Sequence, residues 1–394
     1  MSPRISLAID NCFAAKRWTA PAEWAAVIGD LGVTRVEASA DTECDPLYAP
    51  AEVLRDWVAE VRAVTARTGV RVVNLYSGHG TYATLGLAHP DVRVRDHILD
   101  RWLLPMTRMA GELGAGLGFF THAFSLSTLE DPARYAAAVA DLHQRLAAVA
   151  VAGASHGVVV GVEQMYTPHQ IPWTVSGAEN LLRTVQHLAG KPFYLTIDTG
   201  HQSGQRKFLR PTRDTLERAV RGDAQARNDL WVGTGEATRL LRQPPAGISP
   251  SDQVRQLDTL MDASPHLFAS DADGDPYHWL ERLGCHAPII HLQQTDGRRS
   301  AHLPFSPEHN RTGIIRPRQV LAAIARSYAA PADAGLPPRC AEIHLTLELF
   351  SATADRPADI IDRYRQTVEY WRQFVPTDGL TLDQLLALPE PTHA

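Results

Sequence analysis

Four residues that could bind a metal ion each stand at the end of a short apolar run. The residues are Glu163, Asp198, His291 and Glu348, which follow the runs Val158–Val162, Phe193–Ile197, Pro288–Ile290 and Ile343–Leu347. Three carboxylates and one imidazole suit a hard or borderline divalent ion, namely Mn²⁺, Mg²⁺ or Co²⁺, with Zn²⁺ also compatible. A single acidic residue in such a place is usually a helix cap or a loop contact, but four in succession predict a shared metal site.

The segments around these residues have the composition of pocket loops. Asp198 is followed by Thr-Gly-His, which places His201 close enough to act as a base or hydrogen-bond donor to a substrate. Glu163 and His291 lie in GVEQMYTPHQIPWT and HLQQTDGRRSAHLPF, which are polar, aromatic and proline-bearing. His79 follows the third apolar run and His122 closes the fourth, so both are candidates for substrate contact, with a structural role as the alternative.

Two basic clusters beside these motifs could bind a phosphate group. Arg206 and Lys207 follow the Asp-x-x-His element, and Arg298, Ser300 and His302 follow the candidate ligand His291. Either cluster could form charge-assisted hydrogen bonds to a phosphate. Ordinary solvated loop charges are the alternative for each.

These residues need a scaffold that brings strand ends together. Apolar runs of strand type alternate with segments of helical periodicity, and the first four runs are Ile5–Ile9, Val33–Ala38, Val70–Tyr76 and Leu117–Phe120. Eight such units predict an α/β fold, a (β/α)8 TIM barrel, with the site at the C-terminal ends of the strands. One helix is expected over Val94–Leu113 with a kink at Pro105. An open doubly wound sheet is the alternative, but no GxGxxG motif follows the first run and there is no P-loop.

The spacing also predicts the domain organisation. One barrel domain is expected over residues 1–375, with an insertion at about 203–285 between the sixth and seventh strands. Because this insertion follows a strand, it should lie on the C-terminal face. Residues 376–394 would form a C-terminal tail.

Composition limits the partners. The chain has 394 residues and a formal net charge of −6, which argues against a nucleic-acid or anionic-membrane surface as the main partner. The first residues lack an apolar leader and no apolar stretch is long enough to span a membrane, so we expect a cytoplasmic location. A small molecule is the expected partner, and a homo-oligomer is compatible with the sequence.

The order Glu, Asp-x-x-His, His, Glu on successive strand ends resembles the xylose isomerase-like TIM-barrel superfamily. Within it the pattern is similar to the D-tagatose 3-epimerase and hydroxypyruvate isomerase branch, and the three motifs resemble D-erythrulose 1-phosphate 3-epimerases. The resemblance implies that Glu163, Asp198, His291 and Glu348 bind the metal, that Glu163 and Glu348 also form an acid/base pair, and that His201 contacts a substrate oxygen. Related epimerases often carry an arginine where this chain has Gly297.

The expected activity is a metal-dependent epimerisation or isomerisation of a sugar or sugar phosphate through an enediolate, with a ketose or ketose-phosphate 3-epimerase as the favoured form. The cation would make the hydrogen beside a carbonyl acidic, and carboxylates would remove and return it. A metal-dependent decarboxylase or lyase of a 3-oxo sugar acid is the main alternative. An endonuclease IV-like phosphodiesterase and a non-catalytic sugar-binding module are further alternatives.

Overall fold

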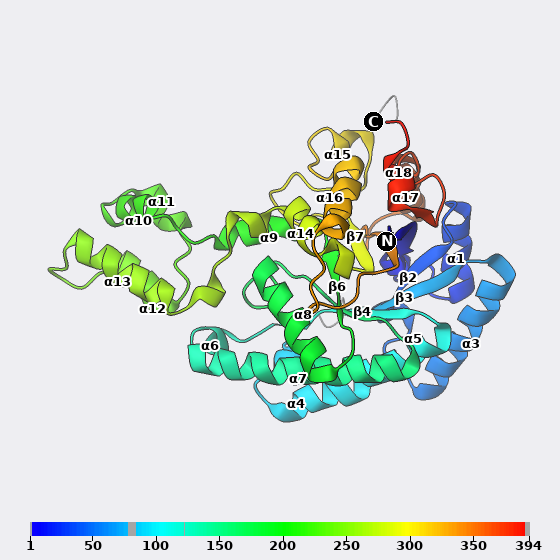
Figure 1. Cartoon of the computed structure of the whole chain (residues 1–394), viewed down its shortest axis with the longest axis horizontal. Helices are drawn as coiled ribbons and strands as arrows, with labels where there is room; N and C mark the ends of the chain where they lie inside the picture. Colours follow the sequence, from blue (N-terminus) through cyan, green and yellow to red (C-terminus); the bar gives the residue numbers. More distant parts are fainter. Residues whose placement is uncertain (1, 78–83, 122, 391–394) are drawn as a thin grey trace.

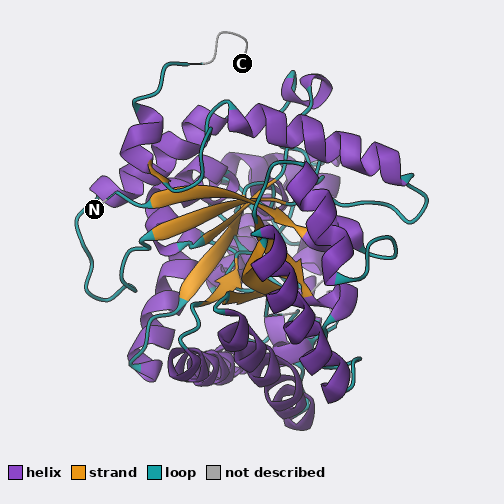
Figure 2. Ribbon diagram, turned by 90° about the vertical axis from the view of Figure 1, so that its right-hand side faces the viewer, coloured by secondary structure: helices purple, strands orange, loops and turns teal. Residues whose placement is uncertain are grey.

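The strands form a closed barrel. The computed structural model describes residues 2–77, 84–121 and 123–390, and within them eight parallel strands pair in the order β2-β3-β4-β5-β6-β7-β8-β1, with β1 pairing back to β2. The strands are β1 (Arg4–Asp10), β2 (Arg35–Ser39), β3 (Arg71–Ser77), β4 (Gly116–Phe119), β5 (Val160–Glu163), β6 (Tyr194–Asp198), β7 (Ile289–Leu292) and β8 (Glu342–Leu347). Figure 2 shows them at the centre of the molecule, surrounded by helices. The predicted (β/α)8 fold is confirmed, and each predicted run differs from its strand only at the ends.

Helices cover the outside of the barrel. Their bounds are α1 (Pro21–Asp30), α2 (Ala40–Glu43), α3 (Ala51–Thr68), α4 (Val92–Ile98), α5 (Leu104–Leu113), α6 (Leu126–Leu129), α7 (Pro132–His156), α8 (Val175–Ala189), α9 (Gln202–Gln205), α10 (Arg213–Val220), α11 (Ala224–Asp229), α12 (Gly235–Arg242), α13 (Pro250–Asp262), α14 (Pro276–Leu283), α15 (Pro307–Asn310), α16 (Pro317–Ala329), α17 (Pro357–Arg372) and α18 (Leu382–Leu386). In α3, for example, Leu54, Trp57 and Val61 are buried at helical spacing and join the core. None of the helices in the described ranges is both long and apolar enough to cross a membrane.

One predicted helix is interrupted. The expected helix Val94–Leu113 consists of α4, a π-helical turn over Leu99–Leu103, and α5. Pro105 is the second residue of α5 and lies directly after the π-helical turn. A π turn and a proline are both recognised causes of helix bending, and here the two adjoin.

The chain between β6 and β7 carries additional helices. Helices α10 to α13 pack around their own apolar cluster, which includes Leu216, Val254 and Leu257. Figure 1 shows these four helices standing out from the barrel on the left. A parallel bridge between Leu209 and Ala269 joins the two chain segments where this part leaves and rejoins the barrel.

The C-terminal segment is attached to the barrel. β9 (Leu380–Thr381) pairs antiparallel with β1, with Thr381 opposite Arg4 at the N-terminal end of that strand. Helix α18 packs against α16, and the Arg318 guanidinium donates hydrogen bonds to the carbonyl oxygens of Leu385 and Leu386 at 3.2 and 3.1 Å. This attachment lies at the end of the barrel opposite the C-terminal strand ends.

Candidate active site

The four predicted metal ligands meet at the C-terminal ends of β5 to β8. Glu163 and Asp198 are the last residues of β5 and β6. His291 lies in β7, where the register places it beside Asp198, and Glu348 follows β8. Each of the four offers one ligand atom, and these atoms all lie within 4.8 Å of one another. The side chains are buried, so the structure brings the four groups into one enclosed cluster.

His291 lies between carboxylates on both sides of its ring. Its Nδ1 is 3.0 Å from Glu163 Oε1 and 3.3 Å from Glu348 Oε2. Its Nε2 is 2.9 Å from Glu37 Oε2, and the Asn74 amide donates a 2.7 Å hydrogen bond to the other oxygen of Glu37. Burial alone would lower the pKa of His291, but the charges of Glu348 and Glu37 and the hydrogen bond to Glu163 raise it well above its ordinary value. The ring therefore presents Nδ1 to the cluster.

Asp198 is fixed by several donors. Its Oδ1 accepts the backbone N–H groups of Gly200 and His201 at 2.6 and 3.0 Å, and Gln293 Nε2 donates to both carboxylate oxygens at 2.9 and 3.0 Å. Burial favours the neutral acid, but the charges of His201, His302 and His291, together with the hydrogen bond from Gln293, lower the pKa of Asp198 to about 2. Asp198 is therefore held as a carboxylate.

The two glutamates of the cluster differ in environment. Burial pushes the pKa of Glu163 upward, yet the hydrogen bond and charge of His291 outweigh it and leave that pKa below its ordinary value. Tyr76 donates a hydrogen bond from its hydroxyl to Glu163 Oε2. The pKa of Glu348 is raised well above its usual range by burial, which the negative charges of Asp198 and Glu163 reinforce. Two carboxylates whose environments push their pKa values apart are the arrangement that separates an acid from a base.

The donor set fits a divalent cation. Three buried carboxylates converge on one point, and burying that negative charge is costly unless positive charge neutralises it. Three oxygens and one imidazole nitrogen are ligands for borderline and hard divalent ions. The cluster could therefore hold a metal ion.

A cavity of about 620 Å³ opens onto this cluster. Glu163 and Glu348 lie in its wall, and its polar lining also includes His201, Ser300 and His302. The remaining lining is largely apolar and aromatic and consists of Ala15, Tyr76, Phe120, Met165, Tyr166, Ala301 and Phe350. Cys12, which follows β1, and Ser351, which follows β8, complete the lining. This combination of a few polar groups in an apolar wall is typical of a small-molecule site.

The predicted substrate-binding residues fall into two groups. His201, Ser300 and His302 line the cavity. Arg206, Lys207 and Arg298 are not among its lining residues. Arg206 donates to the carbonyl oxygens of Gly274 and Gly297 at 3.0 and 3.3 Å, and the Arg298 side chain is 89% exposed. His79 and His122 lie outside the described residues.

His201 has a defined orientation. Its Nδ1 is 2.7 Å from the carbonyl oxygen of Gln164, which can only accept a hydrogen bond, so Nδ1 carries the proton. Its Nε2 lies 4.0 Å from Asp198 Oδ1, and the ring packs against Tyr166 with centroids 4.8 Å apart. In the neutral ring Nε2 therefore carries no proton, and it faces the cavity and Asp198.

Three residues that organise the site were not among the predicted site residues. Tyr76 is the last residue of the apolar run Val70–Tyr76, and Glu37 lies one residue before the end of the run Val33–Ala38, so both lie close to the position that identified the four candidate ligands. Gln293 gave no such signal, although it lies in the polar segment after His291. Its Oε1 accepts the backbone N–H of His302 at 2.6 Å, and its Nε2 donates to Asp198. Gln293 therefore connects the loop after β7 to Asp198. Gly200 is needed for this approach, because a Cβ there would lie 2.3 Å from Gln293 Cδ.

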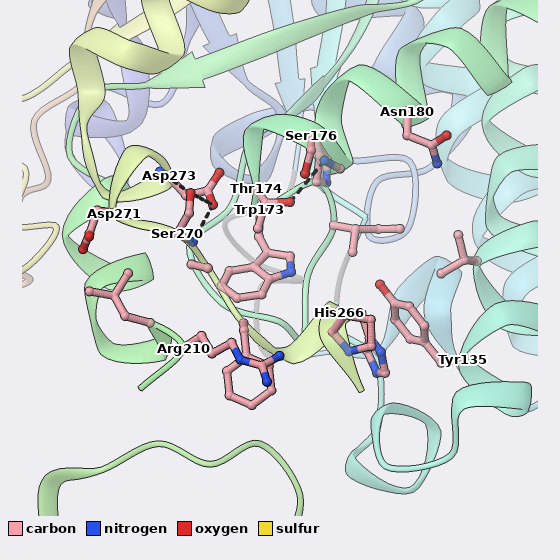
Figure 3. A pocket seen from close by; sticks show the side chains of 18 of the residues that line it. Tyr135, Trp173, Thr174, Ser176, Asn180, Arg210, His266, Ser270, Asp271 and Asp273 are labelled. Carbon is pink, nitrogen blue, oxygen red and sulfur yellow. Dashed lines mark hydrogen bonds between the residues drawn. The ribbon is translucent and has the colours of Figure 1, made fainter. Parts of the chain in front are cut away.

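A second cavity, of about 750 Å³, lies away from the cluster. Figure 3 shows Tyr135 and His266 together at one side of it and Trp173, Ser270 and Asp273 at the other. The rings of Tyr135 and His266 stack with centroids 3.9 Å apart, and Asp273 Oδ1 accepts the N–H of Val175 at the start of α8. Its lining includes none of the four candidate ligands, so cavity size alone does not locate the candidate site.

Solved structures and a curated relative are similar to this chain. A crystal structure of a Rhodospirillum rubrum protein provisionally assigned as a xylose isomerase has a TM-score of 0.65 at 18% identity, covering 93% of this chain and 97% of the other. D-psicose 3-epimerase from Clostridium cellulolyticum, solved with D-tagatose, has a TM-score of 0.52 at 11% identity, covering 94% and 99%. At these identities the likeness shows the fold alone. The D-erythrulose 1-phosphate 3-epimerase of Brucella abortus is 27% identical over 115 residues, which span 29% of this chain and 34% of that protein.

A family model covers a larger part of the sequence. The model described as xylose isomerase-like TIM barrel matches residues 25–225, about half of the chain. The matched residues run from α1 into α11 and include two of the four candidate ligands, Glu163 and Asp198. The barrel and the match agree with the resemblance that the strand-end motifs predicted. The chain therefore belongs to the xylose isomerase-like TIM barrel family.

Proposed function

We propose that this protein is a divalent-metal-dependent 3-epimerase of a ketose or ketose phosphate. The observation that carries the proposal is the pair Glu163 and Glu348, which belong to one buried cluster of ligand type and both line the same cavity. The partial similarity to D-erythrulose 1-phosphate 3-epimerase supports a four-carbon ketose phosphate as the first substrate to test.

Glu163, Asp198, His291 and Glu348 would hold the cation, with Mn²⁺, Mg²⁺ or Co²⁺ favoured by the oxygen-rich set and Zn²⁺ also compatible. When bound, the cation would supply Lewis acidity that makes the hydrogen on the carbon beside a carbonyl acidic. The cavity wall would surround the carbon chain of the substrate, and the apolar side chains of Tyr76, Phe120 and Met165 would exclude water from it.

The side chains have complementary tasks. One glutamate of the pair would remove the proton from one face of the carbon, and the other would return a proton to the opposite face, which inverts the centre. The hydroxyl of Tyr76 would orient Glu163 through its hydrogen bond. His201, with Nδ1 committed to the Gln164 carbonyl, would use Nε2 on a substrate oxygen, and Ser300 and His302 would contact other oxygens of the sugar.

The acid/base assignment is tested with Glu163→Gln and Glu348→Gln. Each variant should lose at least about 100-fold in the rate of proton exchange between ketose phosphate and deuterated solvent, measured by NMR, because general acid–base catalysis contributes about that much or more. Glu112→Gln, at an exposed position on α5, is the matched control and should keep the wild-type rate. Near-normal exchange in both site variants would refute the assignment. Release of CO₂ from a 3-oxo sugar acid, without epimerisation, would instead indicate the lyase.

The ligand assignment is tested separately by elemental analysis. Asp198→Asn and His291→Ala should both lower the metal content of the purified protein, because each removes one donor of the four. Unchanged metal content in both would contradict the assignment, whatever the activity.

A further inference from the structure

We propose that the cavity of about 750 Å³ beside α7 and α8 is a second small-molecule site, and that its ligand is a flat, uncharged heteroaromatic compound of the purine nucleoside type. The cavity is separate from the candidate active site, and the inference does not depend on the proposed function. It follows from buried polar groups that face the cavity without a hydrogen-bond partner and from the aromatic rings around them.

Two parts of the molecule form the walls of this cavity. Helix α7 and the start of α8 contribute one side. The other side consists of residues 209–210 and 265–273, which belong to the segments through which the chain leaves the barrel for helices α10 to α13 and returns. The volume lies in the range of small-molecule sites, about 300 to 1,000 Å³. A ligand here would contact both the barrel and the base of the additional helices.

Trp173 supplies a buried donor that the protein does not use. The residue is 3% exposed, and none of the described residues accepts a hydrogen bond from its indole nitrogen Nε1. Figure 3 shows this nitrogen turned into the cavity, toward Tyr135 and His266. An indole N–H can only donate, and a buried one usually has a partner. The cavity therefore presents a donor that fits a ligand atom with a lone pair.

His143 and Tyr135 add two further groups of this kind. His143 is 6% exposed and lines the cavity, and its ring nitrogens form no hydrogen bond with the described residues. Burial lowers the pKa of His143, so the ring is neutral and offers one donor and one acceptor. The Tyr135 hydroxyl, which points into the cavity in Figure 3, likewise has no partner in the part of the chain that the structure describes. The protein thus leaves three polar groups unsatisfied around one space.

Aromatic rings surround these groups. The rings of Tyr135 and His266 stack with centroids 3.9 Å apart. Phe268 also lines the cavity, and the Arg210 guanidinium lies 5.8 Å from the centroid of its ring. Together with the Trp173 indole, these rings favour a planar ligand, because stacking on an aromatic face adds to the burial of apolar surface and accepts any nucleobase.

The charged groups of the lining leave no net charge for an ionic ligand. Asp273 is already used, since its Oδ1 accepts the N–H of Val175 and its Oδ2 accepts the hydroxyl of Ser270, both at 2.7 Å. Arg210 and Asp271, which are both exposed, carry opposite charges. An uncharged ligand is therefore favoured. A purine fits because its ring nitrogens accept hydrogen bonds, as the unused indole N–H requires, whereas a free sugar brings many hydroxyls that an aromatic wall would leave unpaired.

Indole NMR signals test the site directly. The protein has eight tryptophans, and the signal that disappears in Trp173→Phe identifies the N–H of Trp173 in a ¹⁵N–¹H spectrum. Adenosine should shift this signal in a saturable way. The signal of Trp24, whose N–H donates to Glu43 at 2.7 Å in another part of the molecule, should stay in place. No shift of the Trp173 signal with adenosine or guanosine at millimolar concentration overturns the proposal and means that water alone satisfies the N–H.

Calorimetric titration with adenosine measures the contribution of single groups. Trp173→Phe and Tyr135→Phe each keep an aromatic ring and remove one hydrogen-bonding group, so each should weaken binding by about 2- to 10-fold. Tyr48→Phe, at a position that is 72% exposed, is the matched control and should bind as wild type. Urea unfolding checks that each variant is folded, and the half-buried Tyr135 remains informative if Trp173→Phe is destabilised. Wild-type affinity in both site variants overturns the proposal.

Three further titrations fix the ligand class and the place of binding. Ribose should bind much more weakly than adenosine, and equal binding would overturn the aromatic class. AMP should bind no more tightly than adenosine, and a tighter complex would contradict the uncharged class. Glu163→Gln, in the candidate active site, should bind adenosine as wild type does. Loss of adenosine binding in that variant would place the nucleoside in the candidate active site and overturn the proposal.

Discussion

At the scale of single residues, the orientation of His291 governs how well the cluster can bind a cation. A histidine ligand must direct one ring nitrogen at the metal, and a carboxylate on the other nitrogen commonly fixes that direction. Glu37 meets this requirement, since its Oε2 lies 2.9 Å from His291 Nε2 and its side chain is fully buried. Asn74 in turn anchors Glu37. Glu37 is therefore a positioning residue that acts through His291.

Replacing Glu37 should weaken metal binding without removing a ligand. Glu37→Leu leaves the imidazole without its acceptor, and we expect about a 10- to 100-fold loss of affinity for Mn²⁺, measured by calorimetric titration. Glu37→Gln keeps an acceptor oxygen and should retain most of the affinity. Urea unfolding of both variants serves as the control for stability. Equal affinity for Mn²⁺ in Glu37→Leu and wild type would show that Glu37 does not orient the ligand.

The sequence predicts the residues of the cluster better than the residues that orient them. The convergence of Glu163, Asp198 and Glu348 could be predicted because each follows an apolar run, and barrel geometry brings such strand ends together. The contact between Glu37 and His291 depends on rotamers that span the barrel, which no spacing encodes.

At the scale of elements, the strands were predictable and the C-terminal attachment was not. Buried parallel strands read as continuous apolar runs, which mark each of β1 to β8. β9 has two residues, too few for any periodicity, and forms only because Leu380 and Thr381 meet the backbone of β1. The short helix α18 is held by tertiary packing in the same way, with Leu382 and Leu385 buried.

The packing of α18 should be measurable as stability. Leu385 is 1% exposed and belongs to the main core, so Leu385→Ala should lower the free energy of unfolding by about 2 to 5 kcal/mol in urea titrations. Metal content should not change, because α18 lies at the end of the barrel opposite the cluster. Leu126→Ala, at a position that is 59% exposed, is the matched control and should cost far less. A comparable loss in both variants would contradict the docked arrangement of α18.

At the scale of the whole molecule, closing the barrel buries titratable groups far from the site. His286, which precedes β7, is buried, and His344 lies within β8 near the N-terminal end of the barrel and is half-buried. Burial, joined by the positive charge of Arg339, lowers the pKa of His286 to about 4. Burial and the charges of Arg71 and Arg35 lower the pKa of His344 to about 4 as well. Folding therefore keeps both imidazoles neutral where a solvated histidine would be charged.

These two histidines should make the fold less stable in mild acid. In the unfolded chain His286 becomes protonated below about pH 6.5, whereas in the folded protein it stays neutral down to about pH 4. Between these two pH values the unfolded state binds more protons, so the free energy of unfolding falls as the pH falls. The slope is at most about 1.4 kcal/mol per pH unit for each histidine. Urea unfolding from pH 7 to pH 4.5 should thus give a shallower dependence for His286→Gln than for wild type, whereas His97→Gln, at an exposed position on α4, should follow wild type. Parallel curves for all three proteins would show that His286 is not held neutral by the fold.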